Sequence, residues 1–379
     1  MSDKNKTYTL LVVCHLPPPI HGASVMGQLI ADSDRLRNEF DCIYIPIRMA
    51  TRISNLKGLA FSKLVASLRI YFKIISVLLR HRNSALYLTP TIDGFGAIRD
   101  CIIVMIARAF GCKRILHLHM RGVSNNFIKS RYYRILYRLI FFDADVIHLS
   151  DDLYSDVSCL VEKARFHVVA NGAPDPKNIA PNDSGIRSGP RVGANEPIVL
   201  FLSNLDEEKG ALDLLLACEL LLENGIKFKL VFAGAEVGAL VGSTIRAAAA
   251  KQAKGTIELV GPRYDADKRS LMETADIFAF PSYYRYECQP LSLIEAMAYG
   301  LPLVASKIGA VSDLISDEQN GLLFEQRDVE QLSQKLERLI LDLPLRLQIG
   351  RAARSHFLAH FTAGAFEERF VATISRILN

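Results

Sequence analysis

Residues 280–300 read Phe280-Pro-Ser-Tyr-Tyr-Arg-Tyr-Glu287-Cys-Gln-Pro290-Leu-Ser-Leu-Ile-Glu295-Ala-Met-Ala-Tyr-Gly300. The stretch ends an apolar run that predicts a strand, and it continues through a polar loop into a helical pattern whose first residue is expected to be Pro290. Gly300 ends that pattern, and a second strand-like run follows directly. A strand, a loop, a helix and another strand in this order are typical of a βαβ unit in a parallel sheet.

The same alternation of strand-like and helical runs continues on both sides of this stretch. In the second half we expect strands at 198–203, 229–233, 256–260, 277–280 and 302–305, and helices at 211–223, 267–274, 290–299 and 329–341. In the first half we expect strands at 9–14, 42–45, 85–88, 114–119, 146–149 and 167–169, and helices at 23–31, 57–81, 96–110 and 128–142. The chain is therefore predicted to be an α/β protein with two doubly wound, Rossmann-like domains.

Residues 171–196 separate the two series. They begin with Asn171-Gly172-Ala-Pro-Asp-Pro and continue as polar sequence rich in Gly, Pro and Asn, which is typical of a linker. A length of 379 residues suits two domains. We therefore predict a first domain at 1–170, a linker at 171–196 and a second domain at 197–360.

Charge is divided unevenly along the chain. Residues 1–170 contain 23 Lys and Arg against 13 Asp and Glu, whereas residues 171–379 contain 22 against 27. A basic half can meet nucleic acid, an anionic membrane surface or an anionic substrate. Tyrosines alternate with basic residues over 129–138, but no recognisable nucleic-acid module accompanies them, so we do not expect a nucleic-acid partner.

The helix expected at 57–81 is both apolar and basic. Its apolar residues recur at helical spacing, and the basic residues in and beside it are Lys57, Lys63, Arg69, Lys73, Arg80 and Arg82. Such a helix either lies on an anionic bilayer or is an ordinary surface helix of a basic domain.

Cysteine usage and hydropathy indicate the compartment. The seven cysteines are scattered without a Cys-x-x-Cys pair, which favours a reducing environment over a disulfide framework or a zinc site. No uncharged apolar run of about 18 residues occurs, and the apolar run near the N-terminus is too short for a signal peptide. We expect a cytoplasmic protein, with a peripheral position at the inner face of the membrane left open.

The segment 280–300 also predicts a ligand site. The backbone N–H groups around Gln289 to Ser292 would point to the carboxyl edge of the sheet, where a diphosphate can bind. Glu287 lies just before the helix, and Glu295 lies about one and a half turns inside it. Two carboxylates beside an anion site suit a nucleotide-sugar, and the alternative is a capped amphipathic helix with two incidental surface glutamates.

Several motifs together resemble the retaining glycosyltransferases of family 4 (group 1), which have the GT-B fold. They are Glu287-x7-Glu295 followed by Ala296-Met-Ala-Tyr-Gly-Leu-Pro-Leu-Val-Ala-Ser306, Pro17-Pro-Pro-Ile-His-Gly22-Ala-Ser24, His117-Leu-His119, Asn171-Gly172, Leu202-Ser-Asn-Leu-Asp-Glu-Glu-Lys209-Gly210 and Asn320-Gly-Leu-Leu-Phe324. The resemblance covers most of the chain. It implies that the two domains face a central cleft, with the acceptor on the first and the donor on the second. It also implies that a C-terminal helix at about 361–379 packs back on the first domain.

The resemblance implies a role for each candidate residue. Lys209 would neutralise the departing diphosphate, Glu287 would contact the transferred sugar, and His119 would help to position the reactants. Glu295 would bind the ribose hydroxyls, and Gly22 would contact the donor from the first loop. The other donor-binding candidates are Asn204, Arg263, Gln289, Pro290 and Leu291.

Two positions depart from the family pattern. Many relatives carry Arg near the position of Asn204, so Lys209 would act with helix amides alone or with help from Arg263. Cys288-Gln289 stands where Gly-Phe is usual, which narrows the backbone freedom of the loop.

No metal or cofactor is expected. His117 and His119 could bind a metal from one strand face, but the sequence offers no evident third ligand nearby. Asp143-Ala-Asp145 resembles the Asp-x-Asp of metal-dependent sugar transferases of another fold, but it precedes a buried strand and is interpreted as structural. The resemblance also implies that no catalytic metal is needed.

The function implied is transfer of a sugar, with retention, from a nucleotide-diphosphate sugar to a glycan or lipid-linked acceptor in surface polysaccharide biosynthesis. Two alternatives stay open on the same fold. One is a nucleotide-sugar epimerase, and the other is a nucleotide-sugar-binding protein without turnover.

Overall fold

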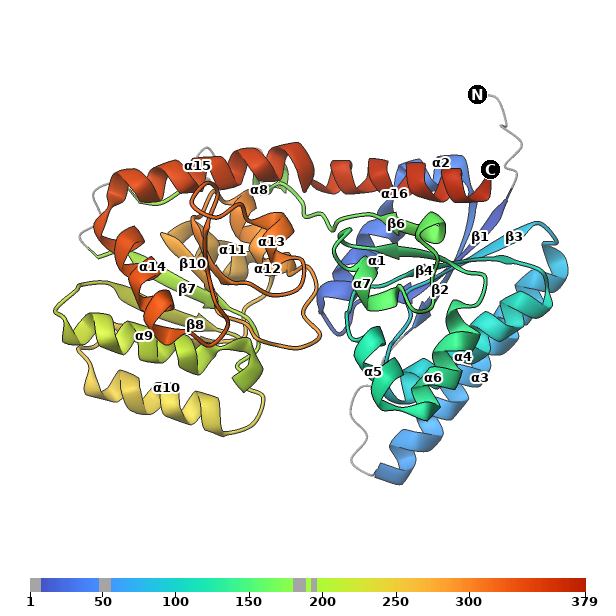
Figure 1. Ribbon diagram of the computed structural model, residues 1–379, viewed down its shortest axis with the longest axis horizontal. Helices are drawn as coiled ribbons and strands as arrows, with labels where there is room; N and C mark the ends of the chain where they lie inside the picture. The colour runs from blue at the N-terminus through green and yellow to red at the C-terminus, as the bar shows by residue number, and fades with distance from the viewer. Residues whose placement is uncertain (1–7, 48–55, 180–188, 192–195) are drawn as a thin grey trace. The chain divides into compact units, whose positions relative to one another are not determined.

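The structure is a computed structural model that describes residues 8–47, 56–179, 189–191 and 196–379 (Figure 1). The chain divides into two compact units. The first comprises Met1–Asn171 with Gly364–Asn379, and the second comprises Gly172–Ala363. Each unit contains one six-stranded sheet whose paired strands are parallel. The predicted α/β class with two doubly wound sheets is therefore confirmed.

The sheet of the first unit has the strand order β2-β1-β3-β4-β5-β6. Its strands are β1 Thr9–His15, β2 Asp41–Ile47, β3 Ser84–Leu88, β4 Lys113–His117, β5 Asp145–His148 and β6 Phe166–Val168. Its helices are α1 Gly22–Asp32, α2 Asp34–Glu39, α3 Leu56–Arg80, α4 Gly94–Ala109, α5 Val123–Lys129, α6 Arg131–Phe141, α7 Tyr154–Val157, the 3-10 helix η1 Lys163–Arg165 and α16 Ala363–Leu378. The central strand β3 is buried along its whole length, as a parallel strand covered by helices on both faces should be.

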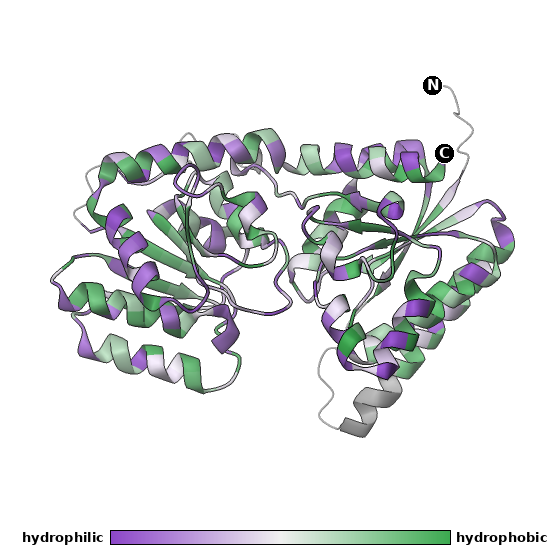
Figure 2. Cartoon of the chain, in the orientation of Figure 1, coloured by the Kyte–Doolittle hydropathy of each residue, from purple (hydrophilic) through white to green (hydrophobic). Residues whose placement is uncertain are grey.

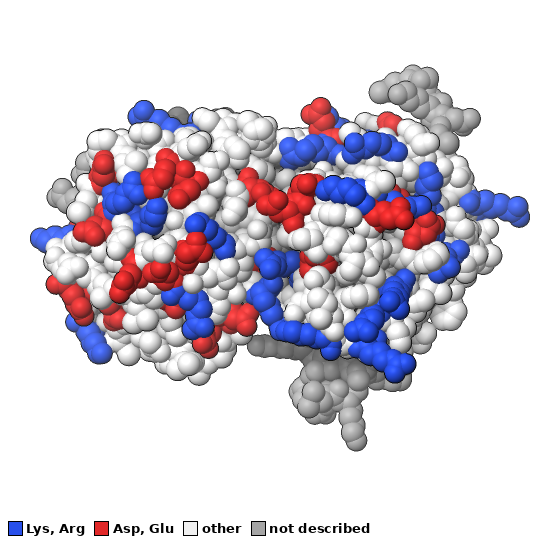
Figure 3. Space-filling view, in the orientation of Figure 1, with Lys and Arg blue, Asp and Glu red and all other residues white. Residues whose placement is uncertain are grey.

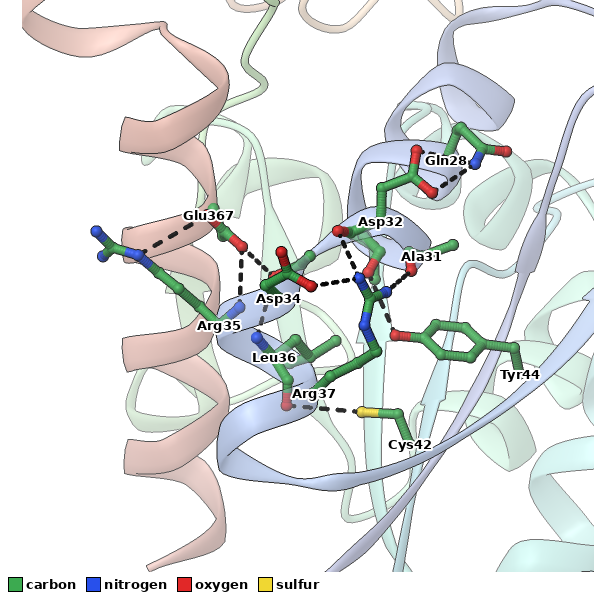
Figure 4. Close-up of polar contacts among 12 residues, drawn as sticks. Gln28, Ala31, Asp32, Asp34, Arg35, Leu36, Arg37, Cys42, Tyr44 and Glu367 are labelled. Carbon is green, nitrogen blue, oxygen red and sulfur yellow. Dashed lines mark hydrogen bonds and ion pairs between the residues drawn. The ribbon is translucent and has the colours of Figure 1, made fainter. Parts of the chain in front are cut away.

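Helix α16 belongs to the first unit although the second unit precedes it in the sequence. Phe370 is fully buried, with its ring centroid 5.2 Å from that of Tyr87 in β3. Glu367 accepts hydrogen bonds from the hydroxyl of Ser33 and from the backbone N–H of Arg35, at the corner between α1 and α2 (Figure 4). Lys113 donates to the last carbonyl groups of the helix. Apolar packing in the middle of α16 and polar contacts beside it hold this helix on the first sheet.

The sheet of the second unit has the strand order β12-β11-β10-β7-β8-β9. Its strands are β7 Ile198–Leu202, β8 Lys229–Ala233, β9 Ile257–Gly261, β10 Ile277–Phe280, β11 Leu303–Ser306 and β12 Leu322–Phe324. Its helices are α8 Pro176–Ile179, the 3-10 helix η2 Glu207–Lys209, α9 Ala211–Glu223, α10 Leu240–Lys251, α11 Asp265–Thr274, α12 Leu291–Ala298, α13 Val311–Leu314, α14 Val329–Leu341 and α15 Leu343–His360.

The structure corrects two predicted elements and adds two long helices that were not predicted. The helix expected at 128–142 is two helices, because Ser130 caps α6 with its hydroxyl and so ends α5. Helix α10 was not predicted, since alanines dominate its last turns, and the longer α15 was also missed. The strand expected at 114–119 begins at Lys113 and ends at His117.

Of residues 171–196, predicted as a linker, Asn171 belongs to the first unit, and the other described residues belong to the second unit. Arg191 forms an ion pair with the buried Asp276, with 2.6 Å between Nη2 and Oδ2. Earlier in the same segment, Asp175 accepts two hydrogen bonds from Nη2 of Arg354 in α15, at 2.8 and 2.9 Å. The rest of the predicted linker, at 180–188 and 192–195, lies outside the described residues.

Candidate functional site

Lys209 and Glu287 form the polar centre of the candidate site in the second unit. Lys209 ends η2 in the segment after β7, and Glu287 lies in the loop between β10 and α12. Lys209 Nζ donates a 2.6 Å hydrogen bond to Glu287 Oε2, and the hydroxyl of Ser282 donates to the same oxygen at 3.1 Å. Two segments far apart in sequence therefore place a cation and a carboxylate at the carboxyl edge of the sheet, where ligands bind in such folds.

Gly210 allows the loop carrying Lys209 to lie directly on the loop carrying Glu287. Its φ is +75°, and a Cβ at this position would lie only 2.1 Å from the carbonyl oxygen of Pro281. Beside it, the N–H of Tyr283 donates to the carbonyl of Glu208 at 2.8 Å. A glycine is required here both by the left-handed backbone and by the close approach.

The ammonium of Lys209 also contacts an aromatic ring. Its Nζ lies 4.1 Å from the ring centroid of Tyr284, which is close enough for a cation–π interaction. Burial raises the pKa of Tyr284, and the charge of Glu287 adds to the effect, so this phenol stays neutral at physiological pH. The ring and the carboxylate of Glu287 together fix the position of the ammonium.

Helix α12 begins one residue later than predicted. Leu291 is its first residue, and Pro290 is the N-cap, because its ψ of 122° is extended rather than helical. Pro290 has no N–H to offer a ligand. The amides at the start of the helix are therefore those from Leu291 onward rather than from Gln289, which is buried before it. They have no acceptor within the helix, and the helix dipole at this end favours an anion.

Glu295 has a partner that the sequence did not reveal. Lys268 of α11 lies with its Nζ 2.6 Å from each carboxylate oxygen of Glu295. Both side chains are partly exposed, so the pair faces solvent on one side. Lys268 is one of many surface lysines in the sequence, and nothing in its spacing relates it to Glu295. Only the packing of α11 beside α12 brings the two together.

Two other donor-binding candidates lie outside this centre. Arg263 is partly exposed and forms an ion pair with Asp267 at 3.3 Å, four residues further along the chain. Asn204 is exposed in the loop after β7. That loop lies against Gly234, where a Cβ would be 1.7 Å from the carbonyl oxygen of Ser203. The structure thus records no contact by which Arg263 assists Lys209.

His119 lies in the first unit, two residues beyond the end of β4. Its ring centroid is 4.2 Å from that of His117. The pKa of His119 is lowered to about 3, chiefly by burial and also by electrostatic interaction with His15 and His21, while a hydrogen bond to Asn171 opposes the shift. The imidazole is therefore neutral at pH 7 and can act only as a hydrogen-bonding group.

Gly22 is the first residue of α1, in the loop that follows β1. His21 caps this helix, since its Nδ1 accepts from the N–H of Ser24 at 3.3 Å. Gly27, one turn further, lets the helix approach β1, because a Cβ there would lie 2.0 Å from the carbonyl oxygen of His15. Gly22 and His119 thus belong to loops at the carboxyl edge of the first sheet, whereas the other candidates belong to the second unit.

Metal binding finds no support in the part of the chain that the structure describes. It contains no group of three or more His, Cys, Asp or Glu arranged to hold an ion. Asp143 forms an ion pair with Arg114 at 3.1 Å, and Asp145 contacts His167 at 3.1 Å. Both aspartates of the Asp-x-Asp sequence are thus engaged by side chains of the first unit.

The second-unit site combines groups suited to an anion and to hydroxyls. An ammonium and the amides of a helix N-terminus can bind a diphosphate, and two carboxylates can accept hydrogen bonds from a sugar or a ribose. The close approach at Gly210 fixes the backbone around them.

Comparison with known proteins finds similarity in this part of the chain. Residues 186–356 match the family model "Glycosyl transferases group 1". The chain is 34% identical over 113 residues to a D-inositol 3-phosphate glycosyltransferase of Corynebacterium diphtheriae, which is 30% of this chain and 26% of the relative. It is 30% identical over 154 residues to the amylovoran biosynthesis glycosyltransferase AmsK of Erwinia amylovora, which is 39% of this chain and 37% of the relative.

A further relative is N,N'-diacetylbacillosaminyl-diphospho-undecaprenol alpha-1,3-N-acetylgalactosaminyltransferase of Campylobacter jejuni. It is 29% identical over 124 residues, which is 33% of this chain and 32% of the relative. The chain therefore spans about a quarter to somewhat over a third of the length of these relatives.

Solved structures are similar over nearly the whole chain. The crystal structure of Anabaena HepE in complex with UDP and glucose has a TM-score of 0.69 and 18% identity, and covers 97% of this chain and 99% of its own. At this identity the likeness shows the fold. The chain thus has the two-domain GT-B fold. Residues 186–356 are similar to the group 1 glycosyl transferases.

Proposed function

We propose that the chain is a retaining glycosyltransferase of family 4 that moves a sugar from a nucleotide-diphosphate sugar to a glycan or lipid-linked acceptor. The observation that carries the proposal is the ion pair of Lys209 and Glu287 beside the N-terminus of α12. This site lies within the residues that match the group 1 family model.

The reaction breaks the bond between the anomeric carbon and the diphosphate oxygen. Negative charge then develops on the departing diphosphate, and preorganised positive groups lower the barrier. Lys209 and the first amides of α12 would supply them, and the ammonium of Lys209 would then move from Glu287 toward the phosphate. Glu287, released from that contact, would accept hydrogen bonds from the transferred sugar.

The acceptor oxygen forms the new bond on the face from which the diphosphate departs. No carboxylate of the site is assigned as a covalent nucleophile, so retention is proposed to follow from this same-face attack. The proton of the acceptor hydroxyl passes to the leaving phosphate oxygen, which balances the step without a metal. His119, neutral at pH 7, would position the reactants through hydrogen bonds.

The acceptor is proposed from the relatives. AmsK is named for amylovoran biosynthesis, and the Campylobacter relative is named for a diphospho-undecaprenol acceptor. A surface polysaccharide intermediate made at the cytoplasmic face of a membrane would suit both. Among the described residues, no helix combines the length and apolar character needed to span a bilayer.

A binding panel with product analysis tests the proposal. UDP, GDP, ADP and their sugar conjugates are added to the wild-type chain and to Lys209→Ala, and thermal midpoints are measured in EDTA. We expect one diphosphate and its sugar to raise the midpoint of the wild type and to raise that of the variant less. An epimerase would convert the donor without an acceptor, and a binding protein would leave it intact. Stabilisation by none of these nucleotides would refute the site.

A further inference from the structure

The helical layer of the first unit exposes an unusual number of large apolar side chains. Of the 23 large hydrophobic residues exposed among the described residues, 14 lie between Leu64 and Phe142. They are Leu64, Leu68, Phe72, Leu79, Phe95, Ile98, Ile102, Met105, Phe110, Ile128, Tyr132, Ile135, Leu139 and Phe142. Single exposed apolar residues are normal, but a concentration of this kind marks an interaction surface.

Most of these residues form stripes on three neighbouring helices; Ile128 lies in α5, and Phe110 and Phe142 directly follow α4 and α6. Helices α3, α4 and α6 lie side by side over the first sheet (Figure 1). Their buried residues, such as Ile74, Val104 and Ile140, alternate with the exposed ones at helical spacing. Each helix therefore has one apolar side packed in the unit and a second one turned outward. Figure 2 shows the hydrophobic residues that run along α3 and α4.

Basic residues accompany the exposed apolar residues. Residues 64–142 contain 13 Lys and Arg but only two acidic residues, Asp93 and Asp100. Asp100 is fully buried and paired with Arg99, so Asp93 is the acidic side chain exposed within this range. Figure 3 shows Lys and Arg gathered over the part of the first unit that α5 and α6 occupy. The side chains of Lys57 and Lys63 lie outside the described residues.

The positive charge of this surface indicates which kind of partner covers it. In a symmetric contact with a second copy, the same basic surface would face itself, and like charges would repel. An anionic bilayer complements both properties, because apolar side chains enter the boundary of the acyl chains while Lys and Arg reach the phosphates.

We infer that the outer faces of α3, α4 and α6 dock on the surface of an anionic membrane, with Phe72, Ile135 and their apolar neighbours inserted and Arg69, Lys129 and Arg131 among the phosphate contacts. The inference rests on the proposed function in one respect: a lipid-linked acceptor would give this protein a reason to be at a membrane. Docking itself needs no catalysis.

The test is co-sedimentation of the full chain with vesicles of phosphatidylcholine alone or of an equimolar mixture with phosphatidylglycerol. We expect binding to the mixed vesicles that weakens as salt rises, and little binding to the neutral ones. Lys129→Glu with Arg131→Glu should weaken partitioning by about tenfold or more. Phe72→Ser with Ile135→Ser should weaken it by about tenfold as well. All four side chains are exposed, so thermal midpoints should stay at the wild-type value.

Matched changes in the second unit are the controls. Each control removes the same kind of exposed side chain, but from the second unit, and should leave vesicle binding unchanged. The apolar control is Leu216→Ser with Leu220→Ser on α9, and the basic control is Lys227→Glu with Lys251→Glu. Three outcomes would each overturn the inference. They are failure to bind the mixed vesicles, equal binding to the mixed and the neutral vesicles, and a dimer in solution that Phe72→Ser dissociates. Nucleotide stabilisation is measured in the same samples without vesicles, so the proposed function stands or falls separately.

Discussion

Nζ of Lys209 lies 2.6 Å from Oε2 of Glu287, and both side chains are largely buried, at 18% and 13% exposure. The two charges therefore neutralise each other at the point where an anionic donor is proposed to bind. A diphosphate that takes the ammonium of Lys209 leaves the carboxylate of Glu287 to a sugar hydroxyl. The ion pair thus links recognition of the diphosphate to recognition of the sugar in the proposed donor.

Lys209→Ala should lower turnover by about a hundredfold to a thousandfold, because a preorganised charge at the leaving group is lost. Release of nucleoside diphosphate at saturating donor measures the effect. Lys227→Ala, an exposed lysine of the same unit, is the control and should keep the wild-type rate. Near wild-type turnover in Lys209→Ala would remove this residue from the mechanism.

Lys268→Ala should raise the KM for the donor by about fivefold or less and change kcat little, because a partly exposed ion pair contributes about 1 kcal/mol or less. Glu295 keeps its carboxylate in this variant but loses the group that orients it. Lys268→Arg, which retains the charge, should restore much of the loss. A fall in kcat with an unchanged KM would contradict a positioning role.

Gly210→Ala should destabilise the second unit more than Gly225→Ala does. Both glycines have positive φ, +75° and +78°, but the space beside Gly225 is open, whereas a Cβ at Gly210 meets the carbonyl of Pro281. The left-handed backbone alone costs about 1–2 kcal/mol, and the clash adds to it. Urea denaturation measures the difference. Equal losses of stability in the two variants would show that the loop carrying Lys209 and the loop carrying Glu287 can separate at little cost.

Stability should fall as the pH is lowered from about 6.5 toward 3. Burial lowers the pKa of His119 and of His148 from 6.5 to about 3, so the unfolded chain binds protons in this window that the folded chain does not. Each histidine can contribute a slope of up to about 1.4 kcal/mol per pH unit. Urea midpoints at several pH values give the slope for the wild type and for His119→Asn, where it should be shallower. An identical slope would argue against burial of this imidazole.

The fold followed from the sequence because its strands are short apolar runs between clear turn signals. Strands 229–233 and 277–280 and helices 211–223 and 329–341 have the predicted bounds. Helix α10 was missed because alanines dominate its last turns, although Val241, Ile245 and Ala248 do keep helical spacing. The split at Ser130 depended on a cap that apolar periodicity does not show.

The residues of the candidate site could be predicted only where they belong to a recognisable sequence motif in a loop that follows a strand. Glu287 and Lys209 belong to motifs quoted from the sequence, and the structure brings them into contact. Lys268 carries no motif, and its place opposite Glu295 depends on how two helices pack. Help from Arg263 was one of two alternatives for Lys209, and the structure pairs Arg263 with Asp267 in its own segment.

The position of α16 has a consequence for synthesis of the chain. The first unit needs Phe366 and Phe370, yet residues 172–363 are translated before α16 emerges. At 5–20 residues per second, this interval lasts about 10–40 s. During it, Tyr87 and His117 lack the helix that buries them, so the second unit can complete its fold first. The nascent chain therefore holds an unfinished apolar surface on its first unit until α16 arrives.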